Sequence, residues 1–332
     1  MATSIINSLA RELWKIRHPG QPITADPPSP ESDSQKYPRT QGLSPDLCFE
    51  LTTSRNQNLI SPDEQNILRR SPVVFFGMSV GSHAALTWMM ESRADDIRIV
   101  DPDTIDATNL NRLRFGWSDV GKTKVSVVSR LLKNINPHAH VAALTKTDAK
   151  NLEKLFTTPS PPVAIVDEID DIGGKVLLRQ LAKKYRLPLI SAADIGDNIA
   201  LDVERYDQDP PPEMFLGRVP EISGINIETL TSQKKIQLII KLVGLEKNSS
   251  RMMESLLSVG KTISTWPQLG ATATISGGLI TTTLKKILTG EPVKSGRYYV
   301  SLDDLLVSDF NSPENIQSRS RLSGIIRQIF SL

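Results

Sequence analysis

Short apolar runs rich in β-branched residues alternate with helical patterns between residues 73 and 191, and this alternation constrains the fold more than any other feature of the chain. The runs are VVFF, IRIV, HVAAL, VAIV and LPLIS, at residues 73–76, 97–100, 140–144, 163–166 and 187–191. Helical patterns lie between them at residues 82–92, 122–133 and 174–185. Strands that alternate with helices form parallel sheets with helices on both faces. We therefore expect an α/β fold with a doubly wound, mostly parallel sheet.

Two less regular regions flank this core. Residues 21–46 are rich in proline, serine and charge, a composition that buries little apolar surface, so we expect a linker or disordered arm that follows an N-terminal helix. After residue 205 we expect helices and one strand, at residues 233–241, 252–257, 271–288 and 297–302. The chain thus divides into an N-terminal arm, a core, and a smaller C-terminal α+β part that completes the sheet: residues 1–52, 53–206 and 207–332.

Composition narrows the classes of partner. The 39 lysines and arginines nearly balance the 37 aspartates and glutamates, so the bulk charge does not point to a nucleic-acid partner. The longest apolar stretch, residues 271–288, is threonine-rich, and we expect no membrane span. The single cysteine, Cys48, allows neither an internal disulfide nor a cysteine-rich zinc site. We therefore expect a cytoplasmic protein without zinc.

A turn of small residues joins the first predicted strand to the first helix, in PVVFFGMSVGSHAAL. In a Rossmann-like unit such a turn places backbone N–H groups and a helix N-terminus against phosphate. The usual G-x-G-x-x-G pattern is altered in two alternative ways. Counted from the strand, Gly77 is the first glycine, and Ser79 and Ser82 take the next two positions; counted from the helix, Gly81 is the third glycine of a shortened turn.

Charged residues are concentrated in DPDTIDATNLNRLRFGWSDVGKTK, after the second strand. Asp101 lies where an acidic residue would accept the hydroxyls of a ribose, although Asp101 and Asp103 also fit a capped turn. Arg112 follows Asn109 on a loop, where a guanidinium can hold phosphate oxygens in a bidentate way. Lys124 opens the next helix as a second cation. Each cation taken alone also fits an ordinary surface position.

This stretch resembles the D-x-D-x-V-x-x-S-N-L-x-R, V-G-x-x-K and N-x-N-P segments of the ThiF-type superfamily. That superfamily includes ubiquitin activators, the sulfur-carrier adenylyltransferases of thiamine and molybdopterin synthesis, and microcin-type peptide adenylators. The matching segments here are residues 101–112, 120–124 and 134–137. Residues 54–77 also resemble the S-R-x-x-x-L and E-x-Q-x-x-L segments that open the family's core. The resemblance covers about residues 53–206.

The resemblance implies an ATP- and Mg²⁺-dependent adenylyltransferase that activates the C-terminal carboxylate of a small protein or peptide. It implies nucleotide contacts from Gly77, Ser79, Gly81, Ser82, Asp101, Asp103, Asn109, Arg112 and Lys124. The residues implied to be catalytic are Arg112, Lys124, Asp170 and Arg55.

Two of these roles rest on further segments. In DEIDDIGGK, which resembles the family's D-x-x-D-N, Asp170 is the implied Mg²⁺ ligand, Asp171 replaces the common asparagine, and Asp167 is interpreted as a turn or cap residue. Arg55 matches the arginine that reaches the ATP of the partner subunit in homodimeric members, so the resemblance implies a homodimer.

Departures from the family pattern keep other functions open. Leu113 stands where members usually have glutamine, and no cysteine follows the nucleotide segment, so the expected product is an acyl-adenylate that no cysteine of this chain attacks. His83 is interpreted as a packing or capping residue. The alternatives are a catalytically inactive nucleotide-binding or scaffold protein, an NAD-dependent oxidoreductase, and a tRNA-modifying relative, which the near-neutral charge disfavours.

Overall fold

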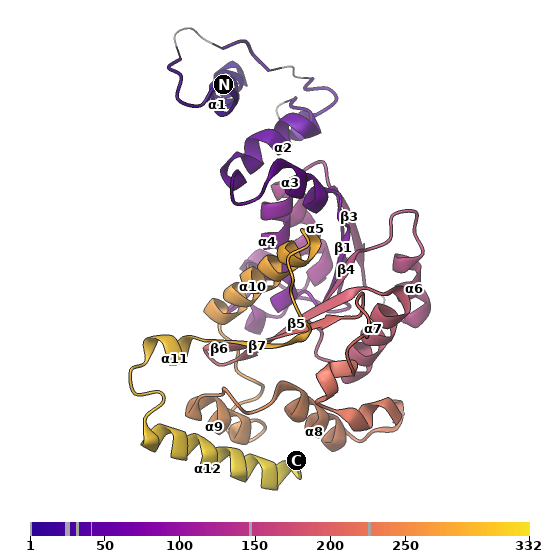
Figure 1. Ribbon diagram of the computed structural model, residues 1–332, viewed down its shortest axis with the longest axis vertical. Helices are drawn as coiled ribbons and strands as arrows, with labels where there is room; N and C mark the ends of the chain where they lie inside the picture. Colours follow the sequence, from indigo (N-terminus) through magenta and orange to yellow (C-terminus); the bar gives the residue numbers. More distant parts are fainter. Residues whose placement is uncertain (1, 24–26, 31–32, 41, 146–147, 225–226) are drawn as a thin grey trace.

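The computed structural model describes residues 2–23, 27–30, 33–40, 42–145, 148–224 and 227–332. These residues form one seven-stranded sheet with the strand order β3-β2-β1-β4-β5-β6-β7 (Figure 1). The strands are β1 (Val73–Phe76), β2 (Asp96–Val100), β3 (His140–Leu144), β4 (Ala164–Asp167), β5 (Pro188–Ile195), β6 (Asn198–Arg205) and β7 (Gly296–Ser301). The first five pair in parallel, whereas β6 and β7 pair antiparallel. The predicted α/β fold with a mostly parallel sheet is confirmed.

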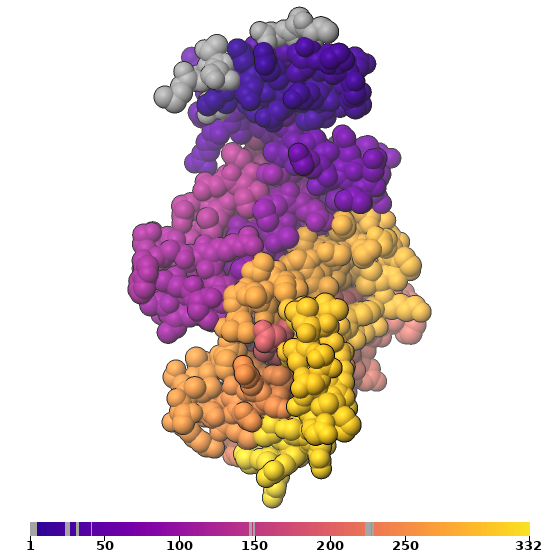
Figure 2. Space-filling model, turned by 90° about the vertical axis from the view of Figure 1, so that its left-hand side faces the viewer, coloured from indigo at the N-terminus to yellow at the C-terminus, as the bar shows by residue number. Residues whose placement is uncertain are grey.

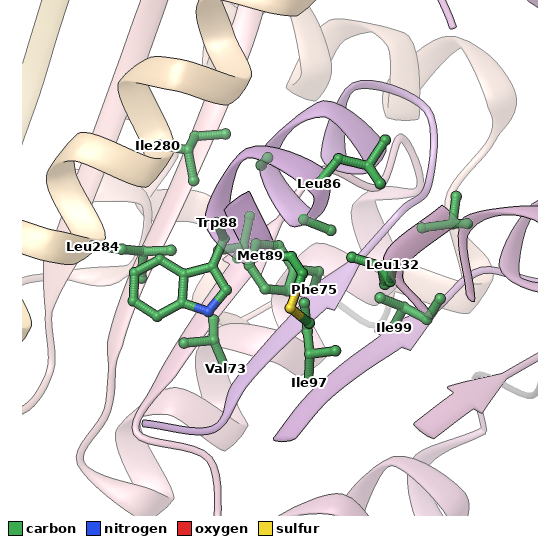
Figure 3. Packing of buried hydrophobic residues seen from close by; sticks show 14 of the residues in the cluster. Val73, Phe75, Leu86, Trp88, Met89, Ile97, Ile99, Leu132, Ile280 and Leu284 are labelled. Atoms are coloured by element: carbon green, nitrogen blue, oxygen red, sulfur yellow. The ribbon is translucent and has the colours of Figure 1, made fainter. Parts of the chain in front are cut away.

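Helices cover both faces of this sheet (Figure 1). One face carries α4 (Val80–Ser92), α5 (Lys124–Ile135) and α10 (Gly270–Leu288), and the other carries α6 (Ala149–Phe156) and α7 (Ile172–Tyr185). Side chains alternate between the two faces, so Val73 and Phe75 pack under α4 while Val74 and Phe76 pack under α7. Figure 3 shows Trp88 of α4 beside Ile280 and Leu284 of α10, at the centre of the larger core.

Helix α10 and strand β7 come from the C-terminal part of the sequence and still belong to the central body. A Cβ atom at Gly277 of α10 would lie 2.6 Å from the Cβ of His83 in α4, so only glycine allows this close approach of the two helices. Strand β7 extends the sheet beside β6. The helix predicted at residues 271–288 and the strand predicted at residues 297–302 are confirmed within one or two residues.

The remaining helices lie at the two ends of the elongated molecule (Figures 1 and 2). The N-terminal end holds α1 (Ala2–Arg17), α2 (Pro45–Thr53) and α3 (Pro62–Arg69), and the C-terminal end holds α8 (Ser232–Val243), α9 (Ser250–Ser258), α11 (Leu302–Leu306) and α12 (Pro313–Phe330). The 3₁₀ helices are η1 (Pro38–Thr40), η2 (Ser54–Asn56), η3 (Ala107–Asn109), η4 (Trp117–Asp119), η5 (Met214–Gly217), η6 (Pro220–Gly224) and η7 (Ile227–Thr229).

Four long elements were not predicted: α2, α6, β6 and α12. Of the predicted arm, residues 24–26, 31–32 and 41 lie outside the described residues, and the rest includes η1 and the start of α2. Among the described helices, none is both long enough and apolar enough to cross a bilayer.

Candidate active site

A cavity of about 780 Å³ opens at the carboxyl ends of β1, β2 and β4. The strand order reverses between β1 and β4, because the chain runs from β1 outward to β2 and β3 and then returns to β4 on the other side of β1. Doubly wound sheets bind ligands at such a reversal point. Six of the residues predicted from the sequence line the cavity: Gly77, Ser79, Asp101, Asp103, Lys124 and Asp170. The opposite wall is formed by the end of β4 and the start of α7.

The glycine turn forms one edge of the cavity. Gly77 has a φ angle of +84°, and a Cβ atom there would lie 2.3 Å from the carbonyl oxygen of Glu168, so the position requires glycine. Ser79 precedes the first residue of α4, and its buried hydroxyl has no hydrogen-bond partner among the described residues. The turn therefore offers a helix N-terminus and a free hydroxyl to an anion.

Asp101 ties this turn to the end of β2. Its carboxylate accepts hydrogen bonds from the backbone N–H of Met78 at 2.5 Å and of Asp103 at 2.7 Å. Burial raises the pKa of Asp101, while the bond from Met78 and the charge of Lys124 oppose that rise. Both oxygens are engaged, so the more exposed Asp103 is the carboxylate that is open to a ligand at this position.

Lys124 begins α5, as the sequence predicts, and its side chain lies in the cavity. The Nζ atom is 2.7 Å from Asp103 and 3.9 Å from Asp101. The ammonium group is thus placed by two carboxylates at the edge of the space where a ligand would lie. A polyanion such as a triphosphate would compete with Asp103 for this cation.

Arg112 lies beside the cavity, on the loop after η3. Its Nη1 donates to the carbonyl of Thr108 at 3.1 Å and to the side chain of Asn111 at 3.0 Å, while its buried Nε has no partner among the described residues. Burial lowers the pKa of Arg112, and the negative charges of Asp170 and Asp194 oppose that change. Arg112 is therefore close enough to both carboxylates to interact with them electrostatically, and its guanidinium keeps one donor without a partner among the described residues.

Asn109 and His83 shape the Arg112 loop. Asn109 is buried, and its side-chain oxygen accepts from the N–H of Asp106 at 3.1 Å. A ring nitrogen of His83 lies 2.7 Å from the carbonyl of Arg112, and burial lowers the pKa of this imidazole. The packing role interpreted for His83 agrees with this contact. In this structure Asn109 likewise holds the loop and does not line the cavity.

Asp194 was not predicted. It lies near the carboxyl end of β5, where one oxygen accepts a hydrogen bond from Ser276 of α10 at 2.6 Å and the other is buried without a partner among the described residues. Burial raises the pKa of Asp194 to about 6. The signal was present in the sequence, because a carboxylate after the run LPLIS falls at the strand end where ligands bind.

Three aspartates at and after the end of β4 have three different roles. Asp167, interpreted from the sequence as a turn or cap residue, accepts from the N–H of Ile169 at 3.3 Å, but its buried carboxylate also pairs with Arg179 at 2.6 Å. The cap of α7 is Asp171, which accepts from the N–H of Gly174 at 2.7 Å. Asp170 is exposed, lines the cavity and makes no hydrogen bond or ion pair with the other described residues.

The other predicted residues lie away from the cavity. Gly81 packs against the side chain of Glu168, and the hydroxyl of Ser82 donates to the carbonyl of Ser79 at 2.8 Å. Arg55 is exposed on η2; the adjacent Asn56 donates to a carbonyl near the end of α4, at the amino edge of the sheet. No group of three or more His, Cys, Asp or Glu side chains in the described part of the chain is arranged to hold a metal ion.

Comparison with known proteins shows the family to which this chain belongs. The sequence profile of the ThiF family matches residues 53–321, and the chain therefore belongs to the ThiF family. The protein of Mycobacterium tuberculosis described as uncharacterized protein MT1398 is 29% identical over 252 residues, which are 76% of this chain and 35% of that protein. The chain thus spans about a third of the length of this curated relative.

Solved structures confirm the fold. PaaA superposes with a TM-score of 0.53 at 21% sequence identity, and the superposition covers 92% of this chain and 94% of PaaA. Escherichia coli MccB, in a crystal structure with ATP, superposes with a TM-score of 0.51 at 19% identity and covers 82% of this chain and 70% of MccB.

Proposed function

We propose that this protein is an adenylyltransferase that activates the C-terminal carboxylate of a small protein or peptide as an acyl-adenylate, with ATP as the second substrate. The observation that carries the proposal is the cavity at the sheet edge, which brings the glycine turn, Lys124 and Asp170 together beside Arg112. Membership of the ThiF family and the ATP-bound structure of the similarly folded MccB support it.

The reaction requires attack of a carboxylate oxygen on the α-phosphorus of ATP. The bond from that phosphorus to the bridging oxygen breaks, and pyrophosphate leaves with the electron pair. Because a carboxylate and a triphosphate are both anionic, the site must supply positive charge and hold the two reactants in position. Lys124 and the backbone N–H groups that begin α4 would hold phosphate oxygens, and Arg112 would bind the phosphates or the incoming carboxylate.

Asp170 fits a Mg²⁺ ligand. Its carboxylate is free of hydrogen bonds and ion pairs within the described residues and lines the cavity, and one carboxylate combined with substrate phosphates is the usual set of ligands for this ion. When bound, Mg²⁺ would neutralise charge on the phosphate oxygens. The residues of the chain itself would position the reactants and hold the substrate carboxylate next to the α-phosphate of ATP.

A homodimer is part of this proposal. Arg55 lies at the amino edge of the sheet, opposite the strand ends that form the cavity of its own chain. It would therefore serve the nucleotide of a partner subunit, as an arginine supplied in trans. Mixing Arg55→Ala with Arg112→Ala tests this arrangement, because a mixed dimer would carry one intact site. Recovery of activity on mixing is expected; two inactive variants that stay inactive after subunit exchange would contradict the arrangement.

The proposed activity predicts carboxylate-dependent exchange of pyrophosphate into ATP. The test uses a pool of peptides with free C-termini and compares Arg112→Ala and Asp170→Ala with two control variants, Arg130→Ala and Asp63→Ala, which remove exposed charges that do not line the cavity. We expect exchange to be lost in the first two variants only. Exchange that persists in both would refute the assignment of the site.

Leu113 favours a second candidate function, that of a nucleotide-binding protein without turnover. This residue replaces the family's glutamine, and it is 6% exposed and packs in the core, so it contributes no polar contact to a nucleotide. The prediction for this candidate is tight Mg-ATP binding without release of pyrophosphate. The exchange assay across many carboxylates distinguishes the two functions.

A further inference from the structure

A second hollow lies in the C-terminal half of the molecule, outside the nucleotide cavity. It has a volume of about 540 Å³ and is enclosed by the turn between β5 and β6, the start of α9, residues 267–269, and the segment from α11 to α12. In Figure 2 the rose-coloured turn between β5 and β6 is visible at the bottom of a hollow between the orange and yellow segments. We call this hollow the C-terminal groove.

The C-terminal groove shares a wall with the candidate active site. The side chain of Asn111, next to Arg112, donates to the carbonyl of Gln268 at 2.8 Å. Thr272 of α10 donates to the carbonyl of Gly196, in the turn between β5 and β6, at 2.8 Å. Gly196 lines the groove and is two residues from Asp194. The lining of the groove is therefore linked by hydrogen bonds to the Arg112 loop, and by sequence to Asp194 at the end of β5.

The groove has an apolar floor and cations at its rim. Met252 and Phe310 are buried there, and Leu269 and Val307 are exposed large apolar residues at its edge. The Arg319 guanidinium lies 4.0 Å from the ring centroid of Phe310 and donates to the carbonyl of that residue. Arg251 is exposed, and its side chain has no hydrogen bond or ion pair with the other described residues.

The other polar groups of the groove are largely engaged. The hydroxyl of Ser249 accepts from the N–H of Met252 at 3.2 Å, and that of Ser255 donates to the carbonyl of Arg251 at 2.8 Å. One oxygen of Asp303 accepts from Asn198 at 3.0 Å. Asp197, at the end nearest the active site, is exposed and can accept from a backbone N–H of a bound chain.

We propose that the C-terminal groove binds the acyl substrate as a short extended peptide tail, through the residues that precede its C-terminal carboxylate. An apolar side chain of the tail packs on Met252 and Phe310, and an acidic side chain pairs with Arg251. This inference rests on the proposed function, because it identifies how that substrate is held. A volume of about 540 Å³ is within the range of about 300–1,000 Å³ that is typical of ligand pockets.

The test measures binding without chemistry. The full-length protein is incubated without ATP with a pool of hexapeptides that have free C-termini, random sequence and a benzophenone side chain at the third residue from the C-terminus. Crosslinked sites and enriched peptide sequences are identified by mass spectrometry. We expect crosslinks on α9, on residues 267–269 and on α12, and enrichment of peptides that carry an acidic residue.

Two substitutions at the rim and the floor sharpen the test. Arg251→Glu is expected to reduce crosslinking at least tenfold and to remove the preference for acidic peptides, and Ser255→Trp is expected to reduce crosslinking by filling the groove. Arg321→Glu is the matched control, because two residues along a helix from Arg319 place it on the opposite face of α12. Unchanged Mg-ATP binding in all three variants confirms that they are folded.

The outcomes separate the groove from the proposed function. Crosslinks elsewhere, no selective crosslinking, or equal crosslinking in wild type and Arg251→Glu would overturn the groove assignment even if pyrophosphate exchange were observed. Crosslinks in the groove without exchange by the enriched peptides would support the groove and refute the adenylyltransferase. A change of oligomeric state in Arg251→Glu, measured by sedimentation, would mean that the groove joins two copies of the chain, and would also overturn the proposal.

Discussion

Two clusters of charged side chains include residues near the carboxyl ends of β4 and β5, and they are built differently. In the first, Arg179 pairs with Asp167 at 2.6 Å and with Glu204 at 2.7 Å, and all three side chains are at most 1% exposed. In the second, Arg112 interacts electrostatically with Asp170 and Asp194, but no ion pair within 4.0 Å joins them among the described residues. The first, which we call the closed cluster, is held by direct ion pairs between fully buried side chains, whereas the second, which we call the open cluster, has no direct ion pair and lies beside the cavity. Both contain buried atoms without a hydrogen-bond partner among the described residues: Arg179 Nε and Glu204 Oε1 in the first, and Arg112 Nε and one Asp194 oxygen in the second.

The pKa values show the same contrast. Burial pushes the pKa of Asp167 upward, but Lys175 and Arg179 outweigh burial and hold it below its ordinary value. Burial also raises the pKa of Asp194, and there the hydrogen bond from Ser276 and the charge of Arg112 do not compensate, so the value reaches about 6. In the closed cluster the cations thus hold the pKa of Asp167 low, although burial still raises that of Glu204, and in the open cluster burial outweighs the nearby charge of Arg112 at Asp194.

Breaking the closed cluster is expected to have the largest effect. Arg179→Met leaves Asp167 and Glu204 buried with their main cation removed, and we expect a loss of about 3–5 kcal/mol in the free energy of unfolding. Urea unfolding followed by circular dichroism measures the loss. The control on the same helix is Lys184→Met, whose pair with Glu153 is exposed and screened by water, so we expect a much smaller loss. Equal effects of the two substitutions would contradict the structural role of the closed cluster.

Removing the cation of the open cluster is expected to affect activity and not stability. Arg112→Ala removes charge that would face developing charge on phosphate, and mutations of this kind reduce turnover about 10²- to 10³-fold, or about 2.7–4 kcal/mol. We expect the free energy of unfolding to change by less than about 1 kcal/mol, since Arg112 has no ion pair among the described residues. Pyrophosphate exchange and urea unfolding on the same samples test both statements. A variant that unfolds as readily as Arg179→Met would remove the distinction between the clusters.

Asp194→Asn tests the open cluster through pH. An unfolded aspartate has a pKa of about 3.9, and the folded value is about 6, so folding favours the protonated form. The resulting stabilisation is complete below about pH 4 and is lost as the pH rises through 6. Wild type should therefore lose about 1.4 kcal/mol relative to the variant between pH 5 and 7.5 in metal-free buffer. The difference is measured by urea unfolding at both values; a constant difference would mean that folded Asp194 does not titrate between them.

Local sequence patterns predicted most of the strands and helices, but not the contacts between residues that are distant in sequence. Strands β1 to β5 could be predicted because apolar residues buried on both faces form continuous runs. Strand β6 was missed although it is buried along its whole length, because Asp202 and Glu204 interrupt its apolar pattern. Their partners are Arg297 and Arg179, which are distant in sequence, so no local pattern could reveal that these charges are neutralised.

The candidate site shows the same division. The glycine turn, Asp101 and Asp170 follow strand ends in the sequence, Lys124 begins a helix, and all of them line the cavity. The hydrogen bond from Ser276 to Asp194 joins α10 to β5 across 82 residues, and no local sequence pattern predicts such a contact. The sequence could not predict that both oxygens of Asp101 accept backbone hydrogen bonds, because almost every residue type carries the same backbone N–H group.

The ion pair of Lys124 and Asp103 joins a buried and an exposed side chain. Its removal should have the smallest effect on stability of the changes considered. The lysine side chain is 9% exposed and the aspartate 64%, so water screens one partner. Asp103→Asn should lower the free energy of unfolding by less than about 1 kcal/mol, and the difference should shrink at high salt because screening weakens exposed pairs. Urea unfolding at low and high ionic strength measures it. A loss as large as that of Arg179→Met, or one insensitive to salt, would place Lys124 in a closed cluster and count against its availability to phosphate.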